Sequence, residues 1–333
     1  MKNIVIRCDA GNIPNLGTGH IVRCVTICKY LIKKFGINKH KFLFLIKSKN
    51  KYQAGKKILD FEKFNYKTLP NKIKDFSLGE INIIKRHNPK IILIDRLGSV
   101  NKKFLSSLKE SKVKTILIDN KSYLKKKSDL YLNPLIFNNT KKNYKNQGYK
   151  YSIFPSLLLK KKIKPKKISK NKKIKIFLFF GGYDYNNIAQ KILKLLNNIK
   201  NIEFIISKKM ITYSKLNNYT TYNSKNFYEK MSISDYAIIS GGLIVFDAIK
   251  YNLPIISIPQ YLHQKKTLLN LKNKKMIKYV NLDKNLNKNI LNLLNDFNYK
   301  PSIINNMKYF QKKFIAKLQY KKIFKEINKL YEN

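Results

Sequence analysis

The 333-residue sequence has no tryptophan, only three cysteines and few acidic residues, and these absences narrow the class of protein. The cysteines, Cys8, Cys24 and Cys28, are too few to form the disulfide framework of a small secreted domain. Cys24 and Cys28 fall on the apolar face of an expected helix, where cysteine packs as a small hydrophobic residue. A metal site would need further ligands, and His40 and His87 have no partner at metal-ligand spacing, so we expect no metal site. We therefore expect all three cysteines to pack in the core.

Acidic residues are scarce, since 18 Asp and Glu stand against 70 Lys and Arg, for a formal net charge of +52. Such an excess is typical of proteins that bind nucleic acid or an anionic membrane. Almost all of it is lysine, however, and Asn, Ile, Tyr and Phe are abundant with it, as A/T-rich codons would produce. The lysines are spread over the chain without a nucleic-acid-binding motif. We therefore expect no specific nucleic-acid partner, and only weak, salt-dependent attraction to anionic substrates and lipid headgroups.

Long hydrophobic runs are also missing. No uninterrupted apolar segment approaches the roughly 18 residues that span a membrane, so we expect no transmembrane segment. A strand-like run begins within three residues of the first residue, which leaves no room for a signal peptide and favours a cytoplasmic protein. The apolar content of 44% is sufficient for a globular fold, and 333 residues suggest two domains.

Short apolar runs alternate with helical patterns in both halves of the chain. Eight runs have the character of buried strands: 4–6, 42–46, 91–95, 115–119, 174–180, 202–206, 236–239 and 255–258. Helical patterns include 78–87, 101–110 and a tail at 303–331. This alternation is typical of parallel, doubly wound sheets. We predict an α/β protein with two similar domains.

The domains are expected at residues 1–160 and 174–333, with the C-terminal helices in the second. A Lys-rich stretch at 161–173, interrupted by Pro165, is predicted to be a linker because it has almost no buried face. A ligand is expected in the cleft between the two domains.

The first strand leads into a glycine-containing loop and a helix with an apolar stripe. Gly17 and Gly19 let the backbone turn tightly and approach a ligand closely. His20 then lies at the helix N-terminus, where the helix dipole favours a neutral imidazole that can act as a base. A structural cap or loop hydrogen bond is the alternative role for His20. Asp95 and Asp119 end two later strands at the same ligand edge, although either can be an ordinary helix cap.

The second half repeats the strand–glycine–helix pattern at two places. At the first, Gly182 follows a strand, and Asp184 and Asn187 precede a helix, whose N-terminus can hold an anion. A purely structural N-cap is about equally expected for Asp184.

At the second place, Gly241 and Gly242 follow a strand and open a helix that carries Asp247 about one turn later. A carboxylate there can accept hydrogen bonds from both hydroxyls of a ribose. His263 and Gln264 then follow the next strand at the same edge.

Together these residues resemble the UDP-sugar hydrolases of the pseudaminic acid pathway and their polysaccharide-biosynthesis relatives, over most of the chain. Two family motifs, Arg-x-Asp, loop, Gly-x-Gly-His-x-x-Arg and Gly-Gly-x-Asp-x-x-Asn, are matched by Arg7, Asp9, Gly17, Gly19, His20 and Arg23, and by Gly181, Gly182, Asp184 and Asn187. The resemblance implies the glycosyltransferase B-type fold of two Rossmann-like domains. It also implies cofactor-free and metal-free release of UDP from a UDP-activated deoxyamino sugar. In that reaction His20 activates water and Asp9 belongs to the catalytic set. The residues expected to bind substrate or nucleotide are Arg7, Gly17, Gly19, Arg23, Gly182, Asp184, Asn187, Gly241, Gly242, Asp247, His263 and Gln264.

Some positions depart from the family pattern. The loop from Ala10 to Leu16 is slightly longer than usual, Asp247 replaces the usual Glu, and Asn252 replaces a common Gly. His263 and Gln264 stand where an Asn-Gln pair is usual. A glycosyltransferase with a glycan or lipid acceptor and a non-catalytic sugar-nucleotide-binding protein are the alternatives, and the sugar and the oligomeric state stay open.

Overall fold

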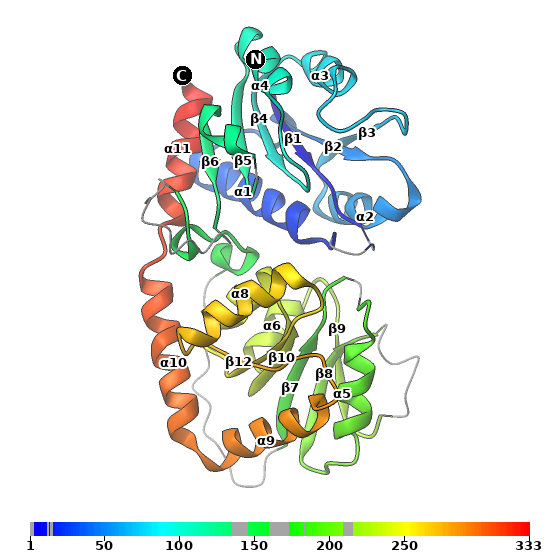
Figure 1. The fold of residues 1–333 in the computed structure, drawn as a ribbon, viewed down its shortest axis with the longest axis vertical. Coiled ribbons are helices and arrows are strands. Elements are labelled where there is room, and N and C mark those ends of the chain that lie inside the picture. Colours follow the sequence, from blue (N-terminus) through cyan, green and yellow to red (C-terminus); the bar gives the residue numbers. More distant parts are fainter. Residues whose placement is uncertain are drawn as a thin grey trace. The chain divides into compact units, whose positions relative to one another are not determined.

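The computed structural model describes residues 3–11, 13, 16–120, 122–134, 146–159, 173–182, 184–208 and 216–333. The chain forms two compact units (Figure 1). Unit 1 comprises Met1–Pro155 and Leu318–Asn333, and unit 2 comprises Ser156–Lys317. The expected linker at 161–173 lies outside the described residues except for Lys173.

Unit 1 is built on a six-stranded sheet in the order β3-β2-β1-β4-β5-β6, with every described pair parallel. The strands are β1 (Asn3–Cys8), β2 (Phe42–Lys47), β3 (Asn65–Leu69), β4 (Pro89–Asp95), β5 (Lys114–Ile118) and β6 (Leu130–Leu132). The helices are α1 (Gly19–Phe35), α2 (Gln53–Glu62), α3 (Leu78–Lys85), α4 (Lys102–Glu110) and α11 (Tyr320–Glu332). Side chains alternate along β1, so Ile4 and Ile6 pack on the core with α1 and α11, and Val5 packs on the core with α3 and α4.

Unit 2 contains a second six-stranded parallel sheet, in the order β12-β11-β10-β7-β8-β9. Its strands are β7 (Ile174–Phe179), β8 (Ile202–Ser207), β9 (Tyr219–Tyr222), β10 (Tyr236–Ser240), β11 (Ile255–Ile258) and β12 (Lys278–Tyr279). The helices are α5 (Ile188–Leu196), α6 (Phe227–Ser232), α7 (Leu243–Lys250), α8 (Leu262–Asn273), α9 (Leu286–Tyr299) and α10 (Pro301–Ala316).

Both sheets have the Rossmann strand order. In each, the first strand lies centrally, the second and third extend to one side, and the fourth to sixth extend to the other. This confirms the expected α/β fold with two Rossmann-like domains. Ligands in such sheets bind where the order reverses, at the carboxyl ends of the first and fourth strands. A ligand is therefore expected at the carboxyl ends of β1 and β4 in unit 1, and of β7 and β10 in unit 2.

The C-terminal helix α11 belongs to unit 1, whereas the expected second domain at 174–333 includes the whole tail. Its apolar face packs on α1, where Phe324 is fully buried and stacks on Tyr30 with ring centroids 3.9 Å apart. Amphipathic spacing predicts that a helix buries one face, but not which surface that face covers.

Candidate functional site

His20 lies in the first turn of α1 and is held by a carboxylate from β4. Its Nδ1 is 2.6 Å from Oδ1 of Asp95, a residue that is fully buried at the end of that strand. Because a carboxylate only accepts hydrogen bonds, a neutral His20 carries its proton on Nδ1 and keeps a lone pair on Nε2. The side chain is 20% exposed, and no described residue hydrogen-bonds to Nε2. His20 therefore has the arrangement of a general base.

Arg23, one turn further along α1, fixes Asp95 from the other side. Its Nε and Nη2 each lie 2.7 Å from one Asp95 oxygen, and its Nη1 lies 2.5 Å from Oδ2 of Asp119, just after β5. Burial alone would raise the pKa of Asp95, but the charges of Arg23 and His20 lower it to about 2. Asp95 thus stays ionised at neutral pH and holds the imidazole ring in place.

Arg7 and Asp9 lie together in a different network. Because side chains alternate along β1, Arg7 points to the α3 side of the sheet, with its Nη1 2.8 Å from Oδ1 of Asp9. The same oxygen accepts the backbone N–H of Lys47 at 3.0 Å. Among the described residues, Asp9 makes no hydrogen bond with His20, so its catalytic role stays a prediction. The structure brings His20 together with Arg23, Asp95 and Asp119 instead.

The glycines before α1 are not required by the backbone geometry. Neither Gly17 nor Gly19 has a positive φ, and an added Cβ on either would meet no described atom within 4 Å. Tight turning is therefore not the reason for glycine here, and close approach of a ligand stays the prediction.

In unit 2, the loop after β7 is shaped by backbone requirements. Gly181 adopts φ +81° and Asn187 adopts φ +50°, both in the left-handed region. Asp184 accepts the N–H groups of Ile188 and Ala189 at 3.0 and 2.7 Å, so its carboxylate caps α5. Both oxygens have this structural role, while Gly182 is exposed at the loop surface.

The loop after β10 requires its two glycines. A Cβ on Gly241 would lie 2.6 Å from Cβ of Gln264 on α8, and Gly242 adopts φ +130°. Oε1 of Gln264 accepts the N–H of Gln260, and Oε1 of Gln260 accepts the N–H of Tyr185 after β7. These contacts join the loops after β7, β10 and β11 at one edge of the sheet.

His263 and Asp247 differ sharply in accessibility. His263 is exposed and stacks on Tyr261, with ring centroids 5.7 Å apart. Asp247 is only 2% exposed, and its Oδ1 accepts the backbone N–H of Ser156 at 2.8 Å. Burial raises the pKa of Asp247 to about 7. Ribose binding by Asp247 stays a prediction, and it requires Ser156 to move away.

The backbone conformation of Asn252 explains why Asn can stand where the resembled family commonly has Gly. Asn252 adopts φ +59°, a conformation that glycine adopts easily and that Asn tolerates better than most residues. The substitution therefore preserves the turn before β11.

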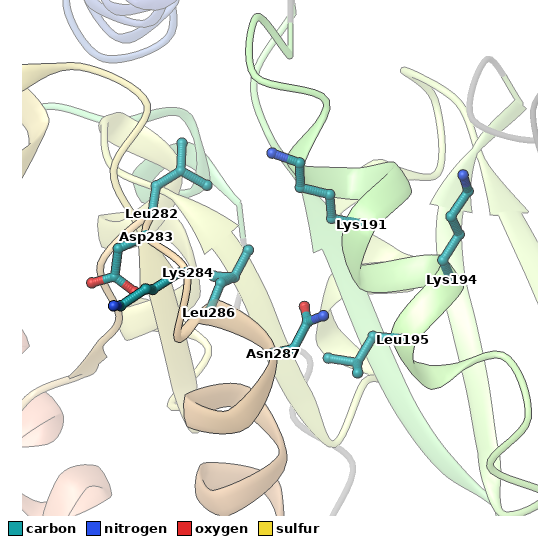
Figure 2. Close-up of a pocket in the computed structure, with 8 residues that line it drawn as sticks. All are labelled: Lys191, Lys194, Leu195, Leu282, Asp283, Lys284, Leu286 and Asn287. Carbon is teal, nitrogen blue, oxygen red and sulfur yellow. The ribbon is translucent and has the colours of Figure 1, made fainter.

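A separate groove of about 590 Å³ lies between α5 and the start of α9. Figure 2 shows Lys191 and Lys194 on the α5 side and Asp283 and Lys284 on the other. The groove shares no residue with the sites above.

The described residues contain no group of three or more His, Cys, Asp or Glu arranged to hold a metal ion. None of the described helices is both long and apolar enough to span a membrane.

Several residues of these networks are not evident from the sequence. The sequence places Asp95 and Asp119 at the ligand edge but does not pair them with Arg23. It does not by itself assign a role to Gln260, or to Glu80 and Arg96, which form an ion pair on the α3 side of the sheet near Arg7. The signal for Arg96 is its position directly after Asp95, where a buried strand ends in two consecutive charged residues.

No protein-family model matches the chain. An uncharacterized protein from Methanocaldococcus jannaschii is 28% identical over 270 residues, which cover 74% of this chain and 53% of that protein. The chain thus spans about half the length of the curated relative that it matches.

Solved structures of the same fold include MurG from Acinetobacter baumannii, with a TM-score of 0.65 and 11% identity. They also include UDP-GlcNAc 2-epimerase from Neisseria meningitidis, bound to UDP-GlcNAc (0.59, 14%), and the spinosyn forosaminyltransferase SpnP (0.67, 8%). Each alignment covers 99% or more of both chains. At these identities the likeness shows the fold, which is the glycosyltransferase B-type fold.

Proposed function

We propose that the chain is a cytoplasmic glycosyltransferase that uses a UDP-sugar donor, with His20 as the general base. The observation that carries this proposal is the 2.6 Å contact between His20 Nδ1 and Asp95 Oδ1 at the β1/β4 edge. It leaves Nε2 available to take a proton from a hydroxyl group. The forosaminyltransferase and the UDP-GlcNAc 2-epimerase among the solved structures of this fold support a sugar-nucleotide donor.

In the proposed reaction, Nε2 of His20 removes the proton from an acceptor hydroxyl as that oxygen attacks the anomeric carbon. The bond from this carbon to the diphosphate oxygen breaks, and its electron pair leaves with UDP. The proton stays on His20, and the ionised Asp95 stabilises the imidazolium. Asp95 is thus a positioning residue, and Arg23 holds Asp95 in turn.

The leaving diphosphate needs hydrogen-bond donors and positive charge rather than a proton. We assign this role to the edge of unit 2, where α7 begins directly after Gly242 and α8 begins at Leu262. Backbone N–H groups and the helix dipole at such N-termini favour anions. Gly182, His263 and Gln264 at the same edge are the remaining candidates for nucleotide contact.

The second candidate is a hydrolase, in which water takes the place of the acceptor hydroxyl. The specific observation for it is the motif with Arg7, Asp9 and His20 that resembles the UDP-sugar hydrolases of the pseudaminic acid pathway. The substrate would then be a UDP-activated deoxyamino sugar for nonulosonic acid or surface polysaccharide synthesis. His20 and Asp95 have the same roles in both reactions.

Incubation with a panel of UDP-sugars, with and without candidate glycan or lipid acceptors, separates the two functions. A transferase releases UDP only when an acceptor is present, whereas a hydrolase releases UDP from the donor alone. UDP binding without release under any condition would favour a non-catalytic binding protein. No binding of UDP or any UDP-sugar would contradict the proposal.

A further inference from the structure

A second buried charge network lies on the α3 side of the unit 1 sheet. Side chains of Arg7 and Arg96 are 0% and 1% exposed, and both contact the same oxygen of Glu80, at 2.5 and 2.7 Å. The other Glu80 oxygen accepts the backbone N–H of Phe76 at 2.5 Å. Both oxygens of Glu80 therefore have hydrogen-bond partners, and neither is paired with Nη2 of Arg7 or with Nε or Nη2 of Arg96.

Two nitrogens of these arginines, Nη2 of Arg7 and Nε of Arg96, are buried without a hydrogen-bond partner among the described residues, and Nη2 of Arg96 is buried with only its ion pair to Asp75. Burying such donors without partners is costly. The carboxylate nearest to both Nη2 atoms is Asp75, whose Oδ1 is 3.8 Å from Arg7 and forms an ion pair with Arg96. Lys47 Nζ contacts the second oxygen of Asp75 at 2.8 Å.

Asp75 differs from the rest of this network in its exposure. Its side chain is 40% exposed and lies in the connection between β3 and α3, whereas Glu80 and Asp9 are buried. The buried charges already balance, because Arg7 and Arg96 oppose Glu80 and Asp9. Asp75 and Lys47 form an outer pair, so Asp75 can leave without exposing an unbalanced buried charge.

We infer that Arg7, Arg96 and Lys47 form a binding site for a carboxylate or phosphate group of a small-molecule ligand, and that Asp75 occupies this site as an internal substitute. Paired guanidinium groups suit both anions, because their N–H groups bind two oxygens at once. The site lies across the sheet from His20, since Asp95 and Arg96 are consecutive and point to opposite faces. The inference does not depend on the proposed enzymatic activity.

The test compares anion binding by the wild type and by Asp75→Asn, which removes the internal competitor but keeps its size. Inorganic phosphate and acetate are titrated separately by calorimetry, at an ionic strength held constant with chloride because the chain carries a net charge of +52. When a competitor limits the fraction of open sites, its removal increases the apparent affinity by the same factor. We expect Asp75→Asn to bind one of the anions about fivefold tighter or more. The anion that gains more identifies the ligand group as phosphate or carboxylate.

Asp283→Asn is the matched control, because it removes the same charge from the lysine-lined groove of unit 2 (Figure 2). We expect its anion affinity to stay within about twofold of the wild type. Without anion, Asp75→Asn also has a lower melting temperature than the wild type, and the preferred anion restores it. Equal gains in both variants, or no gain in Asp75→Asn, would overturn the inference.

Discussion

Asp95 is the residue on which the geometry of His20 depends most. It accepts from His20 on one side and from Arg23 on the other, inside a fully buried environment. Asp95→Asn keeps the size of the side chain but removes the charge that stabilises the imidazolium, and its amide favours the wrong tautomer. We expect kcat for UDP release to fall about 100-fold or more. The Kd for UDP should change less than about twofold, because the proposed nucleotide contacts come from residues of unit 2 and not from Asp95.

The control for this variant is Glu110→Gln, which makes the same carboxylate-to-amide change at the exposed end of α4. Its kcat should equal that of the wild type. A parallel loss of UDP affinity and rate in Asp95→Asn would mean that the residue supports the fold rather than the base.

Asp247 makes stability depend on pH. Its pKa in the folded state is about 7, above the ordinary value of 3.8, so the native protein binds this proton more tightly than the unfolded chain. Stability therefore falls as the pH rises from about 4 to 7, by on the order of 4 kcal/mol, and the loss is complete above pH 7. In Asp247→Asn this dependence should disappear.

Melting temperatures at pH 5 and pH 8 check the prediction for Asp247. Relative to the wild type, Asp247→Asn should gain stability at pH 8 and differ little at pH 5. The same difference between the two proteins at both pH values would show that Asp247 does not titrate in this range.

At the scale of elements, the central strands could be predicted from the sequence and the outer strands could not. All eight expected runs are strands, because strands buried on both faces consist of continuous apolar residues. The strands β3, β6, β9 and β12 were missed. β3 and β9 are partly polar strands at the sheet edges, while β6 and β12 have three and two residues, so none shows a clear hydrophobic pattern.

In the candidate site, the features that depend on local sequence could be predicted, and the contacts between residues far apart in the sequence could not. Sequence patterns placed His20 at the start of a helix and Gly182 and Gly242 directly after strands, since strand–glycine–helix order is local information. They did not pair His20 with Asp95, which is 75 residues away, because that contact depends on β1 and β4 being neighbours. Nor did they reveal the contact of Asp247 with Ser156, which lies 91 residues earlier, and ribose binding by Asp247 stays a prediction.

The packing of α11 on α1 gives a prediction for this helix. Phe324 is fully buried and stacked on Tyr30, so Phe324→Ala should destabilise unit 1 by about 3–5 kcal/mol. Calorimetric melting that resolves the two units should show a shift in one transition only. Tyr309→Ala, at an exposed position of α10, is the control and should shift neither transition noticeably. If Phe324→Ala instead lowered the transition of unit 2, the assignment of α11 to unit 1 would be wrong.

At the scale of the whole molecule, the charge of +52 predicts diffuse rather than specific binding of nucleic acid. Affinity for duplex DNA should fall about 10³-fold or more between 50 and 200 mM salt, since counterion release dominates such binding. Fluorescence anisotropy with two unrelated duplexes measures this, and both should bind equally. Tight binding of one duplex that persists at physiological salt would contradict the expectation.

In the proposed reaction, the general base belongs to unit 1 and the residues proposed to bind the nucleotide belong to unit 2. A variant of the base should therefore lose turnover without losing UDP affinity. His40→Gln provides a matched control, because His40 is exposed and lies outside the predicted site.

The rate of UDP release by His20→Gln, measured with saturating donor and the preferred acceptor, tests this chemistry most directly. We expect a fall of about 10²–10⁴-fold, with the Kd for UDP and the melting temperature unchanged and with His40→Gln equal to the wild type. A rate for His20→Gln within about fivefold of the wild type would contradict the role of His20 as the base.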